Sequence, residues 1–571
     1  MRRILTLTSA CATALAAATA AYGAATAADL DALGRIRDEG FHRSQVMALV
    51  GHLTDSIGPR LTGSPQLKAA DDWTQAKFRE WGLANAHLEP WEFGDGWSFT
   101  RAEVRMTSPV PAVLAALPKA WTPGTSGLAT GQAMLLEIEK LEDLEAHKGE
   151  LAGKILFLNK AAELKDPAAP VFDRYDAAKL EALADFDIPP DREGESWRDK
   201  VRKRRELWLK VADQLVAEGV VATVEVSSFE NGVVRVMGGG GQGIPNQPLG
   251  VPALVMAVEP YNRILRLLEA GEEVEMTLDV AAQFHRESPT AWNSLAEIPG
   301  SDKGGEVVMA GAHLDSWHAG TGATDNAAGS AVVLEAMRIL KTLGLKPKRT
   351  IRAALWSGEE QGLLGSRAYV AEHFASRPEP TDEAELALPA RWRKPTWPIT
   401  PKPEHARLAA YFNLDNGGGK VHGIYAQENL GAKMLFDRFI EPLADLGVTT
   451  VTMDDTGSTD HVPFDAVGLP GFQFIQDGRD YFSRTHHSNI DTYEHLAEAD
   501  MKQAAVVMAS FLYQAAMLDG PFPRKPLPVE PPKKPEPKKE LPKKEVLKQA
   551  EPAKEIAQQE EPGKEVPKKQ E

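Results

Sequence analysis

The chain has 571 residues, a formal net charge of −17 and a single cysteine, Cys11. Its length exceeds what one hydrophobic core normally serves, so we expect two or more domains. The strong negative charge argues against nucleic acid or an anionic membrane surface as a partner. After the first 27 residues, no apolar run reaches the roughly 18 residues that a membrane-spanning helix needs, so we expect no span.

The first 27 residues are typical of a secretory signal peptide. Arg2 and Arg3 form a basic start, an Ala-rich apolar run follows, and residues 25–27 (Ala-Thr-Ala) provide a small-residue exit. A buried N-terminal helix is the alternative. We predict export to the periplasm or to the outside of the cell. Because Cys11 lies inside this segment, the mature protein would contain no disulfide.

Two regions with different patterns follow the signal segment. Residues 29–97 are predicted to be mostly helical, with helices at 35–53 and 64–81 and a Gly-Pro-Arg-Leu-Thr-Gly turn at 58–63 between them. From about residue 120 to 285 the pattern changes to short apolar runs. We expect buried strands there, at 154–158, 219–226 and 254–258.

After about residue 290, predicted strands and helices alternate. This rhythm indicates an α/β fold with a mostly parallel sheet flanked by helices. The expected strands are 306–312, 350–356, 408–414 and 471–476, and the expected helices are 326–343, 361–371, 429–446 and 500–517.

Two segments interrupt or follow this rhythm. Residues 372–407 contain several prolines and tryptophans and form a long connection, which either shapes substrate access or is a surface insertion. Residues 521–571 are rich in Pro, Lys and Glu. Such a composition cannot bury enough apolar surface to fold, so we predict a disordered tail.

Five side chains of the types that bind metal ions are spread over the C-terminal half. His313, Glu360 and Asp415 each follow a predicted strand, and the carboxyl ends of parallel strands form the usual site of open α/β sheets. Imidazole together with carboxylate suits zinc, and cobalt or manganese would also be accepted. The remaining two are Asp325 and His487. Three carboxylates exceed the need of one tetrahedral ion, so we predict two ions that share Asp325.

Two further acids have predicted tasks in hydrolysis. Glu359 precedes Glu360 and would take a proton from the attacking water and return it to the leaving amine. Asp315 would accept the second ring N–H of His313 and so fix its tautomer. Each residue alone is more often an ordinary polar residue at a strand end, but their joint occurrence indicates a hydrolytic site.

Three sequence runs carry a resemblance to a known family. They are Gly-Ala-His-Leu-Asp-Ser-Trp at 311–317, Ala-Thr-Asp-Asn-Ala-Ala-Gly at 323–329 and Trp-Ser-Gly-Glu-Glu-Gln-Gly at 356–362. These runs resemble the M28 family of zinc exopeptidases, and within it the carboxypeptidase Q (plasma glutamate carboxypeptidase) branch. The runs Lys-Pro-Lys-Arg-Thr at 346–350 and His-His-Ser-Asn-Ile-Asp-Thr at 486–492 point the same way.

The resemblance implies a domain plan and a role for each site residue. The peptidase domain would be discontinuous, over 28–119 and 286–520, with an inserted domain similar to the β-rich protease-associated domain at 120–285. Glu359 would be the general base, and Tyr481 is a candidate for steadying the tetrahedral oxyanion. One zinc would be held by His313 and Asp415 and the other by Glu360 and His487, with Asp325 bridging them.

The function that this resemblance implies is an exported exopeptidase that releases amino acids from unblocked peptides or dipeptides. Asn-Ala-Ala at 326–328 is closer to the aminopeptidase members than to carboxypeptidase Q, so aminopeptidase and dipeptidase action both stay open. One alternative is a single-zinc cyclase of the same fold, similar to glutaminyl cyclase, and another is a non-catalytic receptor-like binding protein. Both alternatives predict a lost ligand or base, whereas the full set is present. A peptide is the expected partner, and no pattern fixes the oligomeric state.

Overall fold

A computed structural model describes residues 27–532, apart from 165–169, 186–196, 242, 387 and 389–392. The predicted signal peptide and most of the predicted tail therefore lie outside the described residues. One compact unit ends at Val529, and the remaining residues form a separate C-terminal unit. Among the described helices, none is both long and apolar enough to cross a membrane.

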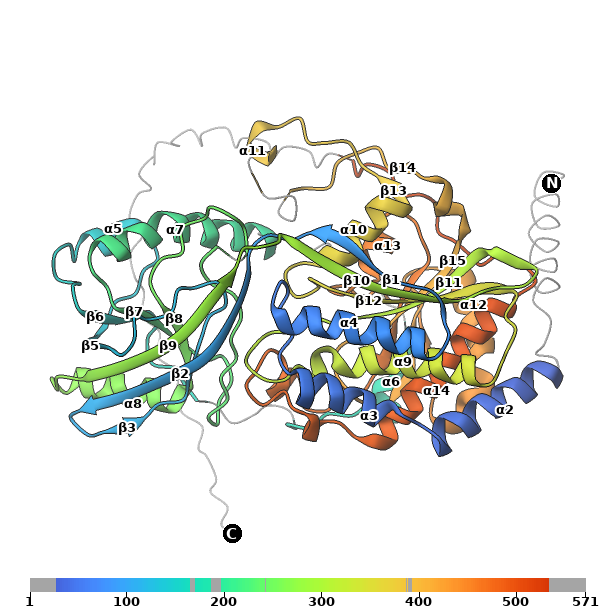
Figure 1. The fold of residues 1–571 in the computed structure, drawn as a ribbon, viewed down its shortest axis with the longest axis horizontal. Coiled ribbons are helices and arrows are strands. Elements are labelled where there is room, and N and C mark those ends of the chain that lie inside the picture. Colours follow the sequence, from blue (N-terminus) through green and yellow to red (C-terminus); the bar gives the residue numbers. More distant parts are fainter. Residues whose placement is uncertain are drawn as a thin grey trace, which may run out of the picture. The chain divides into compact units, whose positions relative to one another are not determined.

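The first sheet has eight strands and lies at the centre of the larger hydrophobic core (Figure 1). Strands β12, β11, β15 and β18 are parallel neighbours, whereas β10 and β16 pair antiparallel on either side of them. The predicted α/β class is confirmed, and the parallel arrangement is found at the centre of the sheet. The order is β1 (Ala84–Glu92), β10 (Thr290–Ile298), β12 (Arg349–Trp356), β11 (Lys303–His313), β15 (Leu408–Asn413), β18 (Gly471–Gln476), β16 (Val421–Tyr425) and β17 (Thr450–Thr452).

Helices cover this sheet, and two of them are almost completely buried. Helices α9 and α14 pack against each other and against β11, while α2 and α3 pack on their outer side (Figure 1). Local signals fix the helix ends: the Ser64 side chain accepts a hydrogen bond from Leu67 N at the start of α4, and Gly344, with φ +62°, follows α9. The helices are α2 (Ala27–His42), α3 (Val46–Gly51), α4 (Pro65–Glu80), α9 (Ala328–Thr342), α10 (Leu364–His373), α12 (Leu430–Ile440), α13 (Val462–Asp465) and α14 (Glu498–Met517).

A second eight-stranded sheet is built from residues 96–285. The predicted insert begins at residue 120, but β2, β3 and β4, which precede this residue, also belong to the sheet, and β2 pairs along most of its length with β9. The similarity of this region to a protease-associated domain stays a prediction. The order is β3 (Ala112–Val113), β2 (Gly96–Ser108), β9 (Glu275–His285), β5 (Ala129–Leu135), β6 (Lys154–Phe157), β7 (Ala222–Val226), β8 (Ala253–Met256) and β4 (Ala116–Pro118). Helices in this region are α5 (Leu141–Glu145), α6 (Ala177–Ala184), α7 (Trp197–Ala217) and α8 (Val258–Glu269).

The long connection at 372–407 contains the short strands β13 (Ala375–Ser376) and β14 (Thr400–Pro401) and the short helix α11 (Glu383–Leu386). Its buried residues Ala375 and Ile399 share a hydrophobic cluster with Leu408, the first residue of β15. This is the end of the strand opposite to the one that carries the candidate site residue Asp415. The same cluster also contains Trp356, the last residue of β12, and both interpretations of this connection stay predictions.

Candidate active site

Three of the predicted ligands lie at the carboxyl ends of three neighbouring parallel strands. His313 is the last residue of β11, Asp415 follows β15, and Glu360 follows β12. The side chains of all three are buried. The alternation of strands and helices therefore brings together residues that are far apart in the sequence.

One cluster forms around the imidazole of His313. Its Nε2 lies 3.2 Å from Asp325 Oδ1 and 3.4 Å from Asp415 Oδ1. Asp325 belongs to a π-helical turn, η2 (Ala323–Ala327), that leads into α9. These three residues each offer a ligand atom, and the three atoms lie within 4.8 Å of one another, as binding of one cation requires.

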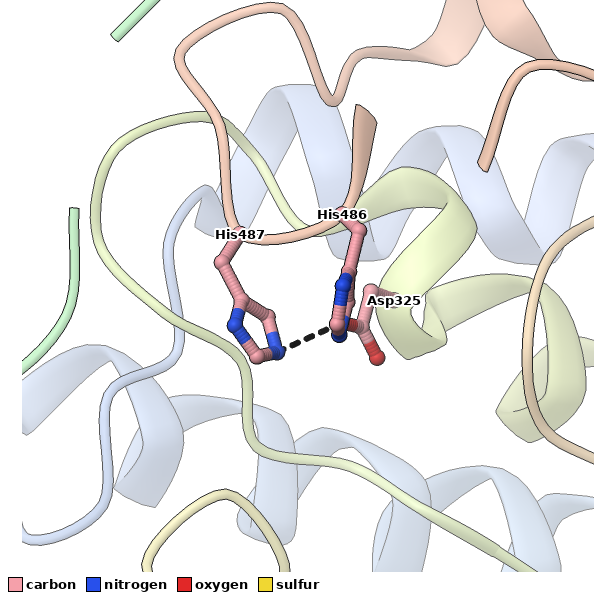
Figure 2. Close-up of side chains that lie close together, drawn as sticks. All are labelled: Asp325, His486 and His487. Atoms are coloured by element: carbon pink, nitrogen blue, oxygen red, sulfur yellow. Dashed lines mark ion pairs between the residues drawn. The ribbon is translucent and has the colours of Figure 1, made fainter. Parts of the chain in front are cut away.

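A second cluster lies on the other side of the Asp325 carboxylate. His487 Nε2 is 3.2 Å from Asp325 Oδ2 and 3.0 Å from Glu360 Oε2. Figure 2 shows that His486 and His487, adjacent on one loop, both reach towards Asp325. His486 Nε2 remains 4.0 Å away from Asp325 Oδ2. The two oxygens of Asp325 thus face two different sets of side chains.

Several polar atoms at this centre are buried without a hydrogen-bond partner. Among the described residues they include His313 Nε2, Asp325 Oδ2 and Glu360 Oε1. An unpartnered buried polar atom costs about 1–3 kcal/mol, so such atoms normally have a ligand or a bridging group. Imidazole nitrogens and carboxylate oxygens are the donors that zinc, cobalt and manganese accept. The residues present therefore fit divalent cations.

Burial and mutual repulsion also change the pKa values of these groups. Burial, together with the charge of Asp325, raises the pKa of Glu360 to about 7. Burial disfavours the charged form of His487, but Glu360 and Asp325 outweigh it and raise the pKa of His487 to about 9. Burial raises the pKa of Glu359 well above its usual range. The site thus holds four buried acids, Asp325, Glu359, Glu360 and Asp415. All four can be ionised together only next to positive charge, which a cation would provide.

Asp315 holds the turn that carries the two adjacent glutamates. Its Oδ1 accepts a hydrogen bond from Glu359 N and its Oδ2 one from Glu360 N, both at 3.3 Å, and Thr62 Oγ1 donates to Oδ2 at 3.0 Å. The contact predicted between this carboxylate and the imidazole is longer, because His313 Nδ1 lies 3.6 Å from Asp315 Oδ1 and 3.0 Å from the Asp315 main-chain oxygen. The main chain of Asp315 orients His313, and its side chain orients the glutamates.

Tyr481 is buried beside the same loop. Its ring packs against the ring of His486, with 4.8 Å between the centroids and 36° between the ring planes. Burial, and then the negative charges of Asp325 and Asp415, raise the pKa of the Tyr481 phenol well above its usual range. The phenol therefore keeps its proton at neutral pH, as a hydrogen-bond donor to an oxyanion must. Its role in the reaction stays a prediction.

Sequence reasoning gave no role to Asp491. Its buried carboxylate accepts hydrogen bonds from Thr324 N at 2.7 Å, from Thr324 Oγ1 at 2.8 Å and from Asp325 N at 3.2 Å. Asp491 thereby fixes the turn that presents Asp325. The sequence signal was its place four positions after His487 in the run that carries the family resemblance.

Arg60, from the predicted turn at 58–63, also lacked a predicted role. It is fully buried. Among the described residues its guanidinium donates to main-chain oxygens, including Leu314 O and Gly322 O at the two ends of the loop that links β11 to η2. Burial lowers its pKa to about 10, so it stays charged. The acceptors are Leu53 O, Gly58 O, Leu314 O, Thr321 O and Gly322 O, at 2.7–3.2 Å.

A small cavity adjoins the clusters. Its walls include Trp317, Asp325, Glu360 and His487. The indole N–H of Trp317 is buried and has no hydrogen-bond partner among the described residues. The walls of this cavity combine an aromatic face with charged groups.

Residues 293–512 match the model of peptidase family M28. This stretch runs from β10 into α14 and contains every predicted site residue. Over this region the resemblance to peptidase family M28 predicted from the sequence is confirmed, and so is the prediction of a metallopeptidase.

Relatives with similarity over most of the chain belong to the expected branch. Carboxypeptidase Q from Bos taurus is 27% identical over 479 residues, which cover 83% of this chain and 85% of the relative. Carboxypeptidase Q from Mus musculus is 27% identical over 492 residues, which cover 85% of this chain and 88% of the relative.

Solved structures support the fold of the whole unit. A Peptidase M28 precursor from Shewanella amazonensis SB2B is 26% identical, with a TM-score of 0.61, and the match covers 88% of this chain and 99% of that chain. BSAP, a zinc aminopeptidase from Bacillus subtilis, has a TM-score of 0.50 at 18% identity, over 82% of this chain and 94% of that chain. The latter likeness supports the fold alone.

Proposed function

We propose that this M28 peptidase is an exported exopeptidase that uses two zinc ions to hydrolyse the peptide bonds of unblocked peptides or dipeptides. The position of Asp325 carries the proposal, since its Oδ1 faces His313 and its Oδ2 faces His487. A carboxylate with one oxygen towards each of two donor sets suits two cations a few ångströms apart. The combination of imidazole and carboxylate ligands supports zinc as the metal.

In this proposal Asp325 is shared and the other four ligands divide into two pairs. His313 and Asp415 lie on one side of Asp325, and Glu360 and His487 lie on the other. Bound there, the two ions would acidify water and polarise the carbonyl of the scissile bond. Asp315 and Asp491 would hold the ligand-bearing turns in place through the main chain.

Proton transfer falls to Glu359. The main-chain hydrogen bond to Asp315 fixes its position, and burial raises the pKa of its carboxyl group well above the usual range, which favours a group that accepts a proton. It would take a proton from the attacking water and deliver it to the leaving amine. Tyr481, which keeps its proton, would donate a hydrogen bond to the oxyanion of the tetrahedral intermediate.

The single-zinc cyclase and the receptor-like binding protein are less well supported. Each predicts that at least one ligand or the base is missing or displaced. In this chain all five ligand-type side chains converge and Glu359 is anchored beside them. Export rests on the N-terminal 27 residues alone and is part of the proposal.

The test uses the full chain loaded with zinc. We expect about two zinc ions per chain by mass spectrometry, and cleavage of a free dipeptide but not of its N-acetyl counterpart. The variant Asp325→Asn should lose both zinc and activity, whereas Asp437→Asn, on the exposed face of α12, should retain both. Equal cleavage of the free and acetylated forms would contradict an enzyme that reads the amine. Absence of cleavage of either, with two ions bound, would favour the binding protein.

A further inference from the structure

A segment of the region that contains the second sheet contacts the loop that carries the candidate ligand His487. This segment, residues 234–236, lies between β7 and β8. Val236 N donates to His487 O at 3.1 Å, and Asn489 N donates to Val234 O at 3.0 Å. The side chain of Asn489 completes the contact, because its Oδ1 accepts from Val234 N at 2.7 Å. Two segments that are far apart in the sequence thus form a main-chain junction.

Arg235 lies at the centre of this junction. It forms an antiparallel bridge with Ser488, and its Nε donates to the His486 main-chain oxygen at 3.2 Å. Its guanidinium lies over the ring of Phe229, 5.5 Å from the ring centroid, and its Nη2 lies 3.5 Å from His487 Nδ1. The side chain of Arg235 therefore ties the residue before His487 to the second-sheet region.

The segment 234–236 is itself anchored in the second-sheet region. The side chains of Val234 and Val236 are buried and share a hydrophobic cluster with Val255 of β8 and with Ala257. Burial of apolar surface stabilises such a cluster in proportion to the area removed from water. The junction thus connects the loop of His487 to a fixed part of the second sheet.

The main chain of His487 is in a conformation that needs support from its surroundings. Its φ is +60°, in the left-handed region, which a residue with a side chain adopts only where neighbouring structure imposes it. Among the described residues, the hydrogen bond from Val236 N is the only main-chain hydrogen bond that His487 makes. The junction therefore holds His487 in the conformation that directs its Nε2 towards the carboxylates of the site.

The other four candidate ligands are held by elements around the first sheet. His313 ends β11, and Asp415 follows β15, which is the parallel neighbour of β11. The carboxylates of Asp315 and Asp491 accept hydrogen bonds from the main chain of the other two. Only the fifth ligand, His487, has its main chain bonded to the second-sheet region.

We propose that the segment 234–236 positions His487 for metal binding, so that the second-sheet region controls one of the two zinc sites and not the other. This inference rests on the proposed function and specifies how one of its sites is assembled. Zinc binding by His313 and Asp415 would be independent of the junction, whereas zinc binding by Glu360 and His487 would depend on it. Replacing a residue that orients a metal ligand typically lowers metal affinity by about 10- to 100-fold.

The experiment titrates zinc into the metal-free full-length protein and resolves two binding steps by calorimetry. The variant His487→Ala identifies the step that belongs to its site. We expect Asn489→Ala, which removes the side-chain part of the junction, to weaken this step by about 10- to 100-fold and to leave the other unchanged. Val236→Ala, which loosens the anchor of the segment without altering any polar group, should weaken the same step.

Asn262→Ala serves as the matched control. The Asn262 side chain also bonds both main-chain groups of one residue, because its Oδ1 accepts from Ala162 N at 2.9 Å and its Nδ2 donates to Ala162 O at 2.8 Å. This contact lies within the second-sheet region, so both zinc steps should match those of the wild type.

Two results would overturn the inference. The first is unchanged zinc binding in Asn489→Ala, and the second is equal weakening of both steps, which would mean that the junction only supports the site as a whole. Failure of the proposed function looks different, because the wild type itself would then bind fewer than two zinc ions. In that case hydrogen exchange of residues 486–490 in the metal-free protein decides. Faster exchange in Asn489→Ala but not in Asn262→Ala would support the inference, and equal exchange would reject it.

Discussion

The adjacent residues Glu359 and Glu360 have the same side chain but different surroundings. Glu360 lies 3.0 Å from His487 Nε2 and faces the Asp325 carboxylate, so its oxygens are placed to bind a cation. Glu359 is buried, and its main chain is held by Asp315. In the proposed function the environment, and not the residue type, would separate the ligand Glu360 from the base Glu359, and pairs of acids divide their tasks in this way in other hydrolases.

This division gives a prediction for Glu359→Gln. The amide keeps the shape of the side chain but has no basic carboxylate, so kcat should fall by about 10²- to 10⁴-fold. KM and the zinc content should stay close to those of the wild type. Steady-state kinetics and mass spectrometry of the bound metal measure the two effects. Loss of zinc together with activity would identify Glu359 as a ligand and contradict its assignment as base.

At the scale of elements, the loop that links β11 to η2 depends on the side chain of Arg60. This loop lies between the candidate ligands His313 and Asp325. Arg60 donates to the Leu314 and Gly322 main-chain oxygens at the two ends of the loop. Without this guanidinium, five main-chain carbonyl groups, of which the four other than Thr321 are buried, would each lose a donor. The geometry of the site therefore depends on a residue that touches none of the candidate ligands.

We predict that Arg60→Met lowers the free energy of unfolding by about 4 kcal/mol or more, because buried carbonyls without donors are costly. Arg60→Lys, which keeps the charge and some of the hydrogen bonds, should lie between Arg60→Met and the wild type. Urea denaturation followed by circular dichroism measures both variants. A stability of Arg60→Met equal to that of the wild type would show that water or a shifted main chain satisfies these carbonyls.

The elements that could be predicted from the sequence are those in which the pattern of apolar residues matches the burial of the element. Strands β11, β12 and β15 are buried over most of their length, and their continuous apolar runs indicated strands at the right places. In contrast, β1 lies at the edge of the first sheet, and many of its residues are partly exposed. Because it has no continuous apolar run, the prediction of a mostly helical segment over 29–97 missed this strand. The start of the second sheet was misplaced because β2 pairs with β9, whose sequence lies far along the chain. Arg235 and His487 are 252 positions apart, and no local pattern encodes such a contact.

At the scale of the whole molecule, the region that contains the second sheet is connected to the metal-ligand loop at more than one point. Besides the junction at Arg235, Arg174 forms ion pairs with Asp477 and Asp500. Asp173 N also donates to Arg479 O at 2.8 Å, just before the loop that carries His487. Since both contacts hold the chain around this loop, its position depends on residues 96–285 as well as on the first sheet.

Metal removal should affect the stability of the whole molecule without unfolding it. The large core around the first sheet is apolar and contains none of the candidate ligands, so the metal-free protein should stay folded. An ion that binds only the folded state adds about 4 kcal/mol per site at a free concentration of 1,000 times its Kd. A chelator should therefore lower Tm by several degrees in calorimetry. It also leaves the buried Glu360 carboxyl next to the charge of Asp325, and burial together with this charge raises the pKa of Glu360.

The variant Asp325→Asn supplies a control for this experiment. It removes a carboxylate that lies 3.2 Å from the imidazole nitrogens of both His313 and His487, so in the presence of chelator it should be no more stable than the wild type, and it should bind less metal. Its Tm should respond little to added zinc, whereas Asp437→Asn should respond as the wild type does. A chelator that leaves the wild-type Tm unchanged, after metal analysis confirms removal, would mean that the buried acids are neutralised by protonation instead. The stability of the folded chain would then be independent of the cations that its site accommodates.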